Sequence, residues 1–394
     1  MTLGRWLAWG RTGRPSRPSR VALVTVAGLT SALAAGPASA RLLQDVKPSP
    51  AQQAQTTYDE LTPAQRVGQL FMAALPSSGA TAAQLTALRA KRIDNVILVN
   101  ASSSGRTAVG AATDVMVGNL TESGVSPFIS TDQEGGEVQR LTGPGFEKMP
   151  TALAQGRMTS SALRSAATTW GKELAGAGVT LDLAPVADTV PKKDAKTNQP
   201  IGIYHREYGH TPAVVGPHVV AFIKGMTAAD VDTTVKHFPG LGRATGNTDT
   251  TAGVTDPTGP HSTFLEPFQD AITAGAQFVM VSSATYPKID PNHLACFSKT
   301  IIGGMLRGTM KFTGVVISDD LGTVALRKFP VGTRAVDFFK AGGTMLLDTT
   351  LGQIRPMVKA VVAEQAASPA FAKQIKTDVL DVLTAKAAAH LIAS

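Results

Sequence analysis

Four short segments of the chain place reactive side chains directly after apolar runs. They are Asp132 in Ser-Thr-Asp-Gln-Glu-Gly-Gly, Asp188 in Ala-Pro-Val-Ala-Asp, the pair Lys236 and His237, and Asp319 in Ser-Asp-Asp. Carboxylates can serve as nucleophiles or as general acids and bases, and lysine and histidine can donate hydrogen bonds to a bound molecule. An acid that follows a strand is usually a helix cap or a solvated turn residue when it stands alone. Four such strand ends that meet at one place would instead form a catalytic site.

Residues 231–256 combine a strand signal with a long loop. The β-branched run from Val231 to Val235 is typical of a short buried strand. Lys236 and His237 follow it and begin a stretch of a dozen residues that also contains one proline and three glycines. Loops held by a rigid scaffold often carry catalytic groups, which favours a functional role for this segment. The alternative is a structural turn beside a solvated lysine.

From Leu61 onward, apolar strand-like runs alternate with amphipathic segments of helical period. We expect strands at 67–75, 95–100, 127–133, 179–187, 231–237, 277–283, 314–319 and 344–348, and helices at 82–91, 161–177, 212–226, 262–274, 299–311, 333–341 and 351–367. Continuously apolar strands, each followed by a helix, indicate a parallel sheet that is covered on both faces. Eight such units predict an α/β fold, a single-domain (β/α)8 TIM-like barrel over residues 58–394, whose chemistry lies at the carboxyl ends of the strands. A doubly wound open sheet is the alternative fold, but no strand is followed by its glycine-rich dinucleotide fingerprint.

The first forty residues have the composition of a secretory signal. Five arginines precede an apolar run at 21–35, and Ala38-Ser39-Ala40 resembles a cleavage site. We expect cleavage after Ala40 and release from the membrane, because the apolar run is too short and too interrupted by glycine for a stable span. Residues 41–57, which are rich in Gln, Pro and Ala, predict a flexible leader. The mature part is expected to be a secreted or extracytoplasmic monomer.

Charge and cysteine content exclude further classes of protein. The signal carries five of the eight net positive charges, so the mature part retains only three and gives no support for nucleic-acid binding. Cys296 is the single cysteine, which rules out an intramolecular disulfide and leaves core burial to stabilise the fold. We expect this thiol to be inert and partly buried. No metal or cofactor is expected, because His205, His210 and His237 lack the spacing of a ligand set.

The polar strand ends, taken in order, resemble those of family 3 glycoside hydrolases. The motifs are Asp132-Gln133-Glu134-Gly135-Gly136 with Arg140-Leu141, Ala184-Pro185-Val186-Ala187-Asp188, Lys236-His237-Phe238-Pro239-Gly240, and Gly314 to Leu321. The similarity is greatest to single-domain β-N-acetylglucosaminidases and extends from Leu61 to the last helix. It implies a secreted hydrolase that acts on a β-linked N-acetylhexosamine or a related β-glycoside, with an amino sugar of the peptidoglycan type as the carbohydrate substrate. It also implies retention of configuration through a covalent glycosyl-aspartate intermediate.

The resemblance assigns roles to individual residues. Asp319 aligns with the catalytic nucleophile of the family, whereas the adjacent Asp320 is expected to cap the segment that follows. The residues matching the substrate-binding positions of the family are Asp132, Arg140, Arg206, Lys236 and His237. Donors and acceptors mixed in this way suit a polyhydroxylated ring.

The acid/base loop departs from the family pattern. The family carries a histidine where this chain has Leu241, and its Asp-Ser-His triplet aligns with Asn247-Thr248-Asp249. In one interpretation Asp249 replaces the histidine as acid/base and Asn247 donates a hydrogen bond to it, which requires a raised Asp249 pKa. In the other, the loop no longer does acid/base work and the chain is a catalytically impaired glycan-binding or regulatory protein of the cell envelope.

A second departure follows the sixth predicted strand. Ser282 and Ser283 stand where the family often has a histidine near the pocket. Serine hydroxyls can still hydrogen-bond, but they make the pocket wall less basic. The preference for an N-acetylated sugar therefore does not follow from this part of the sequence.

Overall fold

The computed structural model describes residues 47–393. The export signal predicted at 1–40 and the first residues of the predicted leader lie outside this range. The described residues form one compact unit that begins at Pro48.

Eight parallel strands form the centre of this unit. They are β1 (Phe71–Pro76), β2 (Asn95–Val99), β3 (Ile129–Thr131), β6 (Leu181–Asp182), β7 (Asp232–Phe238), β8 (Phe278–Val281), β11 (Val315–Ser318) and β12 (Leu346–Asp348). Each strand pairs with the next along the chain, and β12 pairs with β1 so that Phe71 lies opposite Leu346. A parallel bridge between Ile317 and Met345 closes the ring. The barrel predicted from the sequence is thus confirmed, and the open sheet is excluded because its two edges meet.

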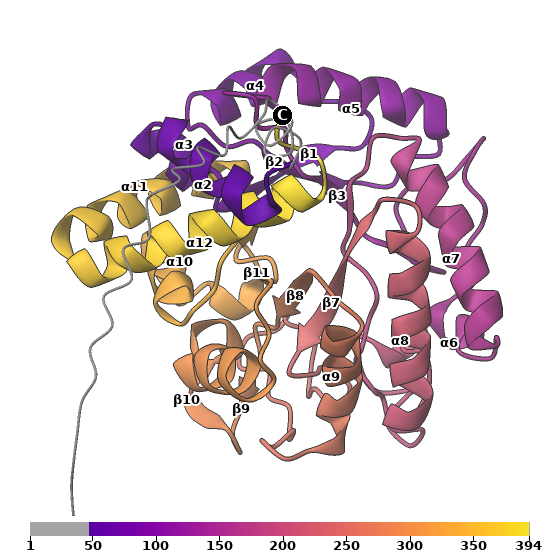
Figure 1. Ribbon diagram of the computed structural model, residues 1–394. Helices are drawn as coiled ribbons and strands as arrows, with labels where there is room; N and C mark the ends of the chain where they lie inside the picture. The colour runs from indigo at the N-terminus through magenta and orange to yellow at the C-terminus, as the bar shows by residue number, and fades with distance from the viewer. Residues whose placement is uncertain (1–46, 394) are drawn as a thin grey trace, which may run out of the picture. The chain divides into compact units, whose positions relative to one another are not determined.

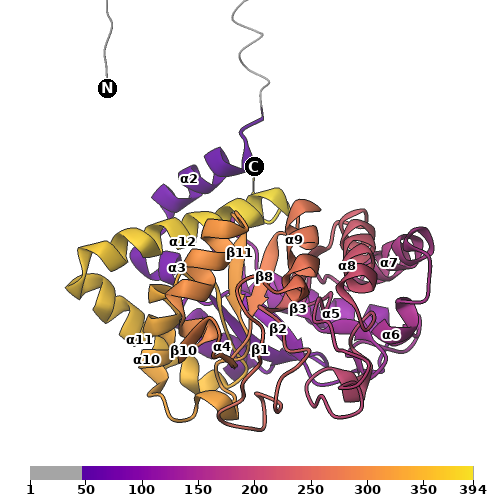
Figure 2. The ribbon, with the colours of Figure 1, turned by 90° about the horizontal axis from the view of Figure 1, so that it is seen from below.

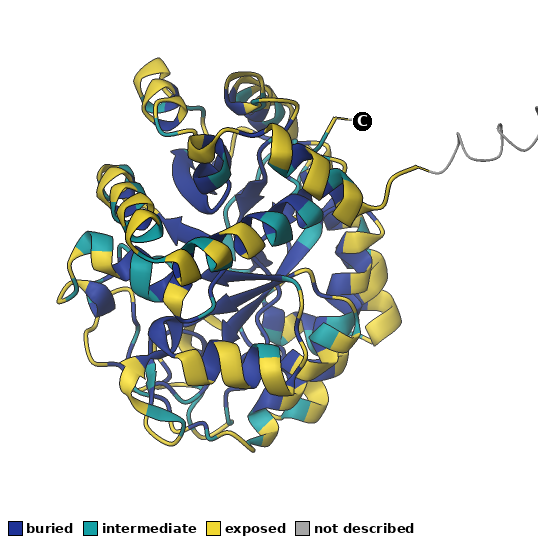
Figure 3. Ribbon diagram, turned by 60° about the vertical axis from the view of Figure 1, so that its left-hand side comes forward, coloured by how far each residue is buried: buried dark blue, intermediate teal, exposed yellow. Residues whose placement is uncertain are grey.

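Helices surround the strands in Figure 1, with α4 and α5 along one side and α7 and α8 along another. Their bounds are α2 (Pro50–Glu60), α3 (Pro63–Gly68), α4 (Ala82–Arg89), α5 (Arg106–Leu120), α6 (Ala152–Gln155), α7 (Ser160–Ala175), α8 (Pro212–Thr227), α9 (Glu266–Thr273), the π-helix η4 (Thr300–Thr309), α10 (Val331–Lys340), α11 (Leu351–Ala367) and α12 (Pro369–Ala388). Figure 3 shows the strands buried at the centre and the outward sides of the helices exposed. Both faces of the strands are therefore covered, so their residues are buried even where they are polar, as Thr233, Thr234 and Lys236 of β7 are.

Short elements connect the barrel at the carboxyl ends of its strands. They are two hairpins, β4 (Gln133–Gly135) with β5 (Val138–Gln139) and β9 (Thr285–Tyr286) with β10 (Asp290–Leu294), and the 3-10 turns η1 (Gly202–Tyr204), η2 (Thr263–Leu265), η3 (Ala295–Phe297) and η5 (Val324–Leu326). The β4–β5 hairpin follows β3 and carries Glu134. Its turn needs Gly135, whose φ is +98° and whose position leaves no room for a Cβ, since that atom would lie 2.3 Å from the Pro150 carbonyl oxygen.

The flexible leader predicted for residues 41–57 is wrong from Pro50 onward. Residues 50–57 belong to helix α2, where Ser49 accepts a hydrogen bond from the Gln52 backbone and the Gln52 side chain bonds back to the Ser49 N–H. The helix packs against α12, as Figures 1 and 2 both show. Composition alone suggested a linker, whereas a capping box and tertiary packing produce a helix.

The first strand also begins later than predicted. Residues 63–68 form α3, because Thr62 and Gln65 make another capping box and Pro63 occupies the first helical turn.

Among residues 47–393, no helix has both the length and the apolar character needed to cross a bilayer. Cys296 is buried completely rather than partly, and burial raises its thiol pKa to about 12, which agrees with the inert role expected.

Candidate active site

A cavity of about 900 Å³ opens at the carboxyl ends of the barrel strands, and we call it the strand-end cavity. It is lined by every site residue predicted from the sequence: Asp132, Arg140, Arg206, Lys236, His237, Asn247, Asp249 and Asp319. Asp132 and Asp319 directly follow β3 and β11, Lys236 and His237 lie near the end of β7, and the others belong to the connecting loops. The polar strand ends therefore do meet at one place, as the barrel hypothesis required.

Lys236 is the centre of a buried ion-pair network. Its Nζ lies 2.6 Å from Asp132 Oδ1 and 2.6 Å from Glu134 Oε1. Arg206 binds Glu134 with two parallel hydrogen bonds, from Nε at 2.8 Å and from Nη2 at 2.7 Å. Lys236 and Glu134 are nearly inaccessible to solvent, whereas Asp132 and Arg206 reach the cavity. The network thus holds Asp132 as an acceptor and Arg206 as a donor in place for a polyhydroxylated ligand.

The charges in this network stabilise one another. Burial alone would raise the pKa of Glu134, but Arg206 and Lys236 hold it well below its ordinary value. Burial alone would lower the pKa of Lys236, yet Asp132 and Glu134 raise it overall. Glu134 and Lys236 are therefore both ionised near neutral pH, and their charges are tolerated in the interior because each compensates the other.

His237 is oriented by Asp188. The Nδ1 atom of His237 lies 2.7 Å from Asp188 Oδ2, and Asp188 Oδ1 accepts the backbone N–H of Leu241 at 2.8 Å. Asp188 is completely buried, so the carboxylate fixes both the imidazole ring and the start of the following loop. This contact engages Nδ1 and leaves Nε2 for the cavity, which His237 lines.

Asp319 follows β11, is half-buried at the wall of the cavity and has one carboxylate oxygen without a hydrogen bond in the described part of the chain. Its Oδ1 accepts the backbone N–H of Asp320 at 2.8 Å, and its own N–H donates to the Val281 carbonyl at 3.0 Å. No hydrogen bond to its Oδ2 is found among residues 47–393. Burial raises the pKa of Asp319 to about 6, His237 opposes the shift and the charge of Asp249 adds to it. The carboxylate is therefore ionised and poorly hydrated at neutral pH, as a nucleophile should be.

Asp249 lies at the tip of the loop that follows β7 and lines the strand-end cavity, although the residue is exposed. The protein around its carboxylate raises the pKa by displacing water; His237 and Arg206 oppose the shift, and Asp320 and Asp132 add to it. A raised pKa is the property required of a general acid near neutrality. The electrostatic interaction between Asp249 and Asp319 means that the two carboxyl groups titrate as a pair.

The contact expected between Asn247 and the Asp249 carboxylate is not the one observed. The amide oxygen of Asn247 accepts the backbone N–H of Asp249 at 2.9 Å. Asparagine commonly bonds in this way to the backbone two residues ahead, which stabilises a turn. Asn247 therefore shapes the loop tip and does not donate to the carboxylate.

Two backbone hydrogen bonds attach this loop tip to the segment after β11. The N–H of Val324 donates to the Asp249 carbonyl at 3.3 Å, and the N–H of Ala325 donates to the Thr248 carbonyl at 3.2 Å. Leu241, at the position of the missing family histidine, lines the same cavity and is buried. Folding thus places Asp249 at the cavity that holds Asp319 without any imidazole from this loop.

Two further expectations concern residues near the predicted nucleophile. Asp320 caps the following segment as predicted, because its carboxylate accepts the N–H groups of Gly322 and Thr349 and the Thr349 hydroxyl. Ser282 and Ser283, by contrast, do not line the cavity, since Ser282 bonds Tyr286 and Ser283 contacts Cys296 within the core. Met280 forms that part of the wall instead, so this side of the cavity is apolar.

Sequence reasoning did not assign Glu134 and Asp188 to the site. Both were visible within motifs, yet neither reaches the substrate space directly; they hold Lys236, Arg206 and His237. The alternation of side chains along an extended segment puts residues 132 and 134 on the same side, which was the available signal for Glu134. No comparable pattern identified Asp188 as the partner of an imidazole 49 residues away.

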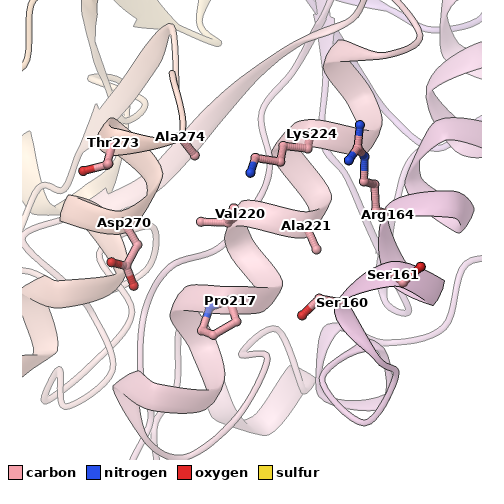
Figure 4. Close-up of a pocket in the computed structure, with 10 residues that line it drawn as sticks. All are labelled: Ser160, Ser161, Arg164, Pro217, Val220, Ala221, Lys224, Asp270, Thr273 and Ala274. Atoms are coloured by element: carbon pink, nitrogen blue, oxygen red, sulfur yellow. The ribbon is translucent and has the colours of Figure 1, made fainter.

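A second hollow of about 650 Å³ lies on the outer surface, between α7, α8 and α9. Figure 4 shows Pro217, Val220 and Lys224 of α8 between Arg164 of α7 and Asp270 of α9. It shares no lining residue with the strand-end cavity and contains no pair of carboxylates. The strand-end cavity is therefore the candidate active site.

Comparison with known proteins identifies the family of the chain. The sequence profile described as Glycosyl hydrolase family 3 N terminal domain matches residues 64–378. A β-hexosaminidase of Xylella fastidiosa strain M12 is 37% identical over 218 residues, which cover 53% of this chain and 62% of that protein. The β-hexosaminidase LpqI of Mycobacterium tuberculosis is 32% identical over 273 residues, covering 64% of this chain and 67% of LpqI. The chain thus spans about three fifths of the length of the first curated relatives.

A solved structure covers more of the chain. The crystal structure of a β-N-acetylhexosaminidase from Beutenbergia cavernae is 43% identical, with a TM-score of 0.81, over 83% of this chain and 98% of that one. A family 3 β-N-acetylglucosaminidase from Paenibacillus is 28% identical, with a TM-score of 0.76, over 85% of this chain and 64% of that one. The barrel therefore has counterparts among solved structures that are described as glycosidases.

Proposed function

Because this chain belongs to glycosyl hydrolase family 3, we propose that it is a β-N-acetylhexosaminidase that hydrolyses its substrate with retention of configuration. The observation that carries the proposal is the pairing of Asp319 and Asp249 at one cavity whose floor holds a network of hydroxyl-binding charges. The names of the relatives support the amino sugar as the substrate class. As the natural substrate we propose a β-linked N-acetylglucosamine residue that derives from peptidoglycan.

The proposed reaction has two steps. In the first, Asp319 Oδ2 attacks the anomeric carbon, the bond to the leaving oxygen breaks, and Asp249 gives its proton to that oxygen. In the second, the Asp249 carboxylate takes a proton from water, the water oxygen attacks the anomeric carbon, and Asp319 leaves. Two inversions produce net retention. Asp132, Lys236, Arg206 and His237 hold the hydroxyl groups of the sugar, and Arg140 extends the binding surface.

The assignment of Asp249 as acid/base predicts a leaving-group effect. Asp249→Ala is expected to lower kcat/KM by roughly 10²- to 10⁴-fold for a substrate with a poor leaving group, and far less for a dinitrophenyl glycoside. Azide should restore turnover and yield a β-glycosyl azide, because azide needs no general base. Steady-state kinetics with both substrates and product identification by NMR check these outcomes.

The same variant should change one limb of the pH profile and keep the other. The alkaline limb, which reports loss of the Asp249 proton, should disappear. The acidic limb, which reports ionisation of Asp319, should remain, because in the proposed mechanism Asp249 is protonated and uncharged in that pH range. Unchanged activity in Asp249→Ala on poor leaving groups would assign the acid/base to another residue while leaving the hydrolase function in place.

The replacement of the family histidine supports a second candidate function. With Leu241 and Asp249 in the acid/base loop and Asp249 exposed, the chain could bind glycans of the cell envelope with little turnover. The two functions are separated by assaying the wild-type protein on aryl β-N-acetylglucosaminide and aryl β-glucoside, with Asp319→Asn as reference. A wild type that hydrolyses neither substrate faster than Asp319→Asn supports the binding function.

We also propose that the enzyme acts outside the cytoplasm. The support is the arginine-rich start, the apolar run and the Ala-Ser-Ala sequence at 38–40. Expression in the native host should yield a mature chain beginning at Arg41, checked by N-terminal sequencing of the protein from the envelope and the medium. Recovery of the uncut chain from the cytoplasm alone would contradict this location.

A further inference from the structure

Tyr204 is the one aromatic side chain that lines the strand-end cavity within the described part of the chain. The residue is 42% exposed, an unusual position for a large ring. It belongs to η1, two residues before Arg206, whose guanidinium takes part in the buried network. The ring therefore lies at the open side of the cavity, and the charged network lies at its floor.

The turn that carries Tyr204 is held rigidly. The amide oxygen of Asn198 accepts the N–H groups of Ile201 and Gly202 at 3.1 and 2.9 Å. The Asn198 amide group donates to the Leu241 carbonyl at 2.9 Å, which links the turn to the loop after β7. Because Asn198 is buried, these bonds fix the backbone beneath the ring. A fixed backbone leaves only the side-chain rotation of Tyr204 to be lost when a ligand covers the ring.

The cavity is larger than one sugar ring requires. Its volume of about 900 Å³ is near the upper end of the range for drug-sized ligands, roughly 300–1,000 Å³. The sugar that is attacked by Asp319 is accounted for by Asp132, Lys236 and Arg206 at the floor. The leaving group must therefore extend toward the open side, where Tyr204 is exposed.

We propose that Tyr204 is a stacking platform for the sugar on the leaving-group side of the scissile bond, and so determines specificity for glycans of two or more sugars. A pyranose ring has an apolar face of C–H groups that can cover an aromatic face and displace water from it. This inference rests on the proposed hydrolase function, and it adds the size of the substrate. A methyl aglycone has no such face and gains nothing from the platform.

Comparison of kcat/KM on two substrates distinguishes sugar stacking on Tyr204 from a general effect on catalysis. Tyr204→Ala is expected to lower kcat/KM for N,N′-diacetylchitobiose roughly 3- to 20-fold while leaving that for methyl β-N-acetylglucosaminide within about twofold. Tyr204→Phe should keep the preference for the disaccharide, because the ring remains. Ile203→Ala is the matched control, since Ile203 belongs to the same turn and is 36% exposed but does not line the cavity. Equal losses on both substrates, or none on the disaccharide, would overturn the platform.

A binding measurement keeps the platform testable if the hydrolase function fails. In the Asp319→Asn background, calorimetric titration with the same two glycosides reports binding without turnover. Introducing Tyr204→Ala should weaken binding of the disaccharide roughly 3- to 20-fold and leave binding of the methyl glycoside unchanged. A wild type that cleaves neither glycoside refutes the hydrolase, whereas equal disaccharide affinity with and without Tyr204 refutes the platform.

Discussion

Asp319→Asn is expected to lower kcat/KM for an aryl β-N-acetylglucosaminide by roughly 10⁴-fold or more. The amide cannot form the glycosyl ester, and no second carboxylate follows β11 with an oxygen free to attack, because Asp320 is committed to Gly322 and Thr349. Wild type treated with a slowly released fluorosugar should gain the mass of one sugar on the peptide that contains Asp319. Liquid chromatography with mass spectrometry locates that label, and NMR of the first product tests retention.

Asp320→Asn is the matched control for the loss of the nucleophile. It removes a neighbouring charge that raises the pKa of Asp319, so the acidic limb of the pH profile should lie at lower pH than in wild type. Asp319 must be ionised to attack, so activity falls as pH decreases through its pKa. Above this limb the control should remain within a few-fold of wild type. If Asp319→Asn and Asp320→Asn hydrolysed the substrate at the same rate, Asp319 would not be the nucleophile.

Glu134→Ala is expected to lower the free energy of unfolding by about 3–5 kcal/mol. Glu134 bonds both Lys236 and Arg206, so its removal leaves two cations inside the protein with only Asp132 close to Lys236. Removal of one buried ion-pair partner destabilises the fold because the charges that remain are not hydrated. Thermal unfolding followed by circular dichroism should show a midpoint lower by roughly 5–15 °C.

Glu137→Ala provides the comparison for this stability prediction. Glu137 lines the same cavity from the same hairpin but is exposed, so its removal should cost less than about 0.5 kcal/mol. Glu134→Gln keeps a hydrogen-bond acceptor, so its unfolding midpoint should lie between those of Glu134→Ala and Glu137→Ala. Equal midpoints for Glu134→Ala and Glu137→Ala would show that the network does not stabilise the fold.

The pH dependence of stability gives Glu134 a second signature. Its pKa is lowered by Arg206 and Lys236 against the effect of burial, so its contribution is complete above the ordinary value of 4.5 and decreases as pH falls below it. The difference in midpoint between wild type and Glu134→Ala should therefore narrow in acid. A lost packing contact alone would leave the difference independent of pH.

Much of the fold is contained in local sequence patterns. Runs such as Val315 to Ile317 and Phe278–Val281 are apolar throughout, because both faces of each strand are buried, and this allowed eight strands to be predicted in order. Polar residues follow these runs because the carboxyl ends of barrel strands face solvent or substrate. The candidate residues can therefore be named from the order of residues along the chain. The leader was misassigned because a capping box and a partner helix outweigh composition.

Contacts between the candidates were decided by tertiary structure alone. Lys236 meets Asp132 across 104 residues of sequence, and Arg206 meets Glu134 across 72. No local periodicity encodes such distances; they depend on the parallel pairing of β3 with β6 and of β6 with β7. The tertiary fold also determines which carboxyl groups are dehydrated, and so the raised pKa of Asp319 and of Asp249. Sequence by itself determined the reactive groups and their scaffold, whereas folding decided their partners and protonation, because both depend on neighbours distant in the chain.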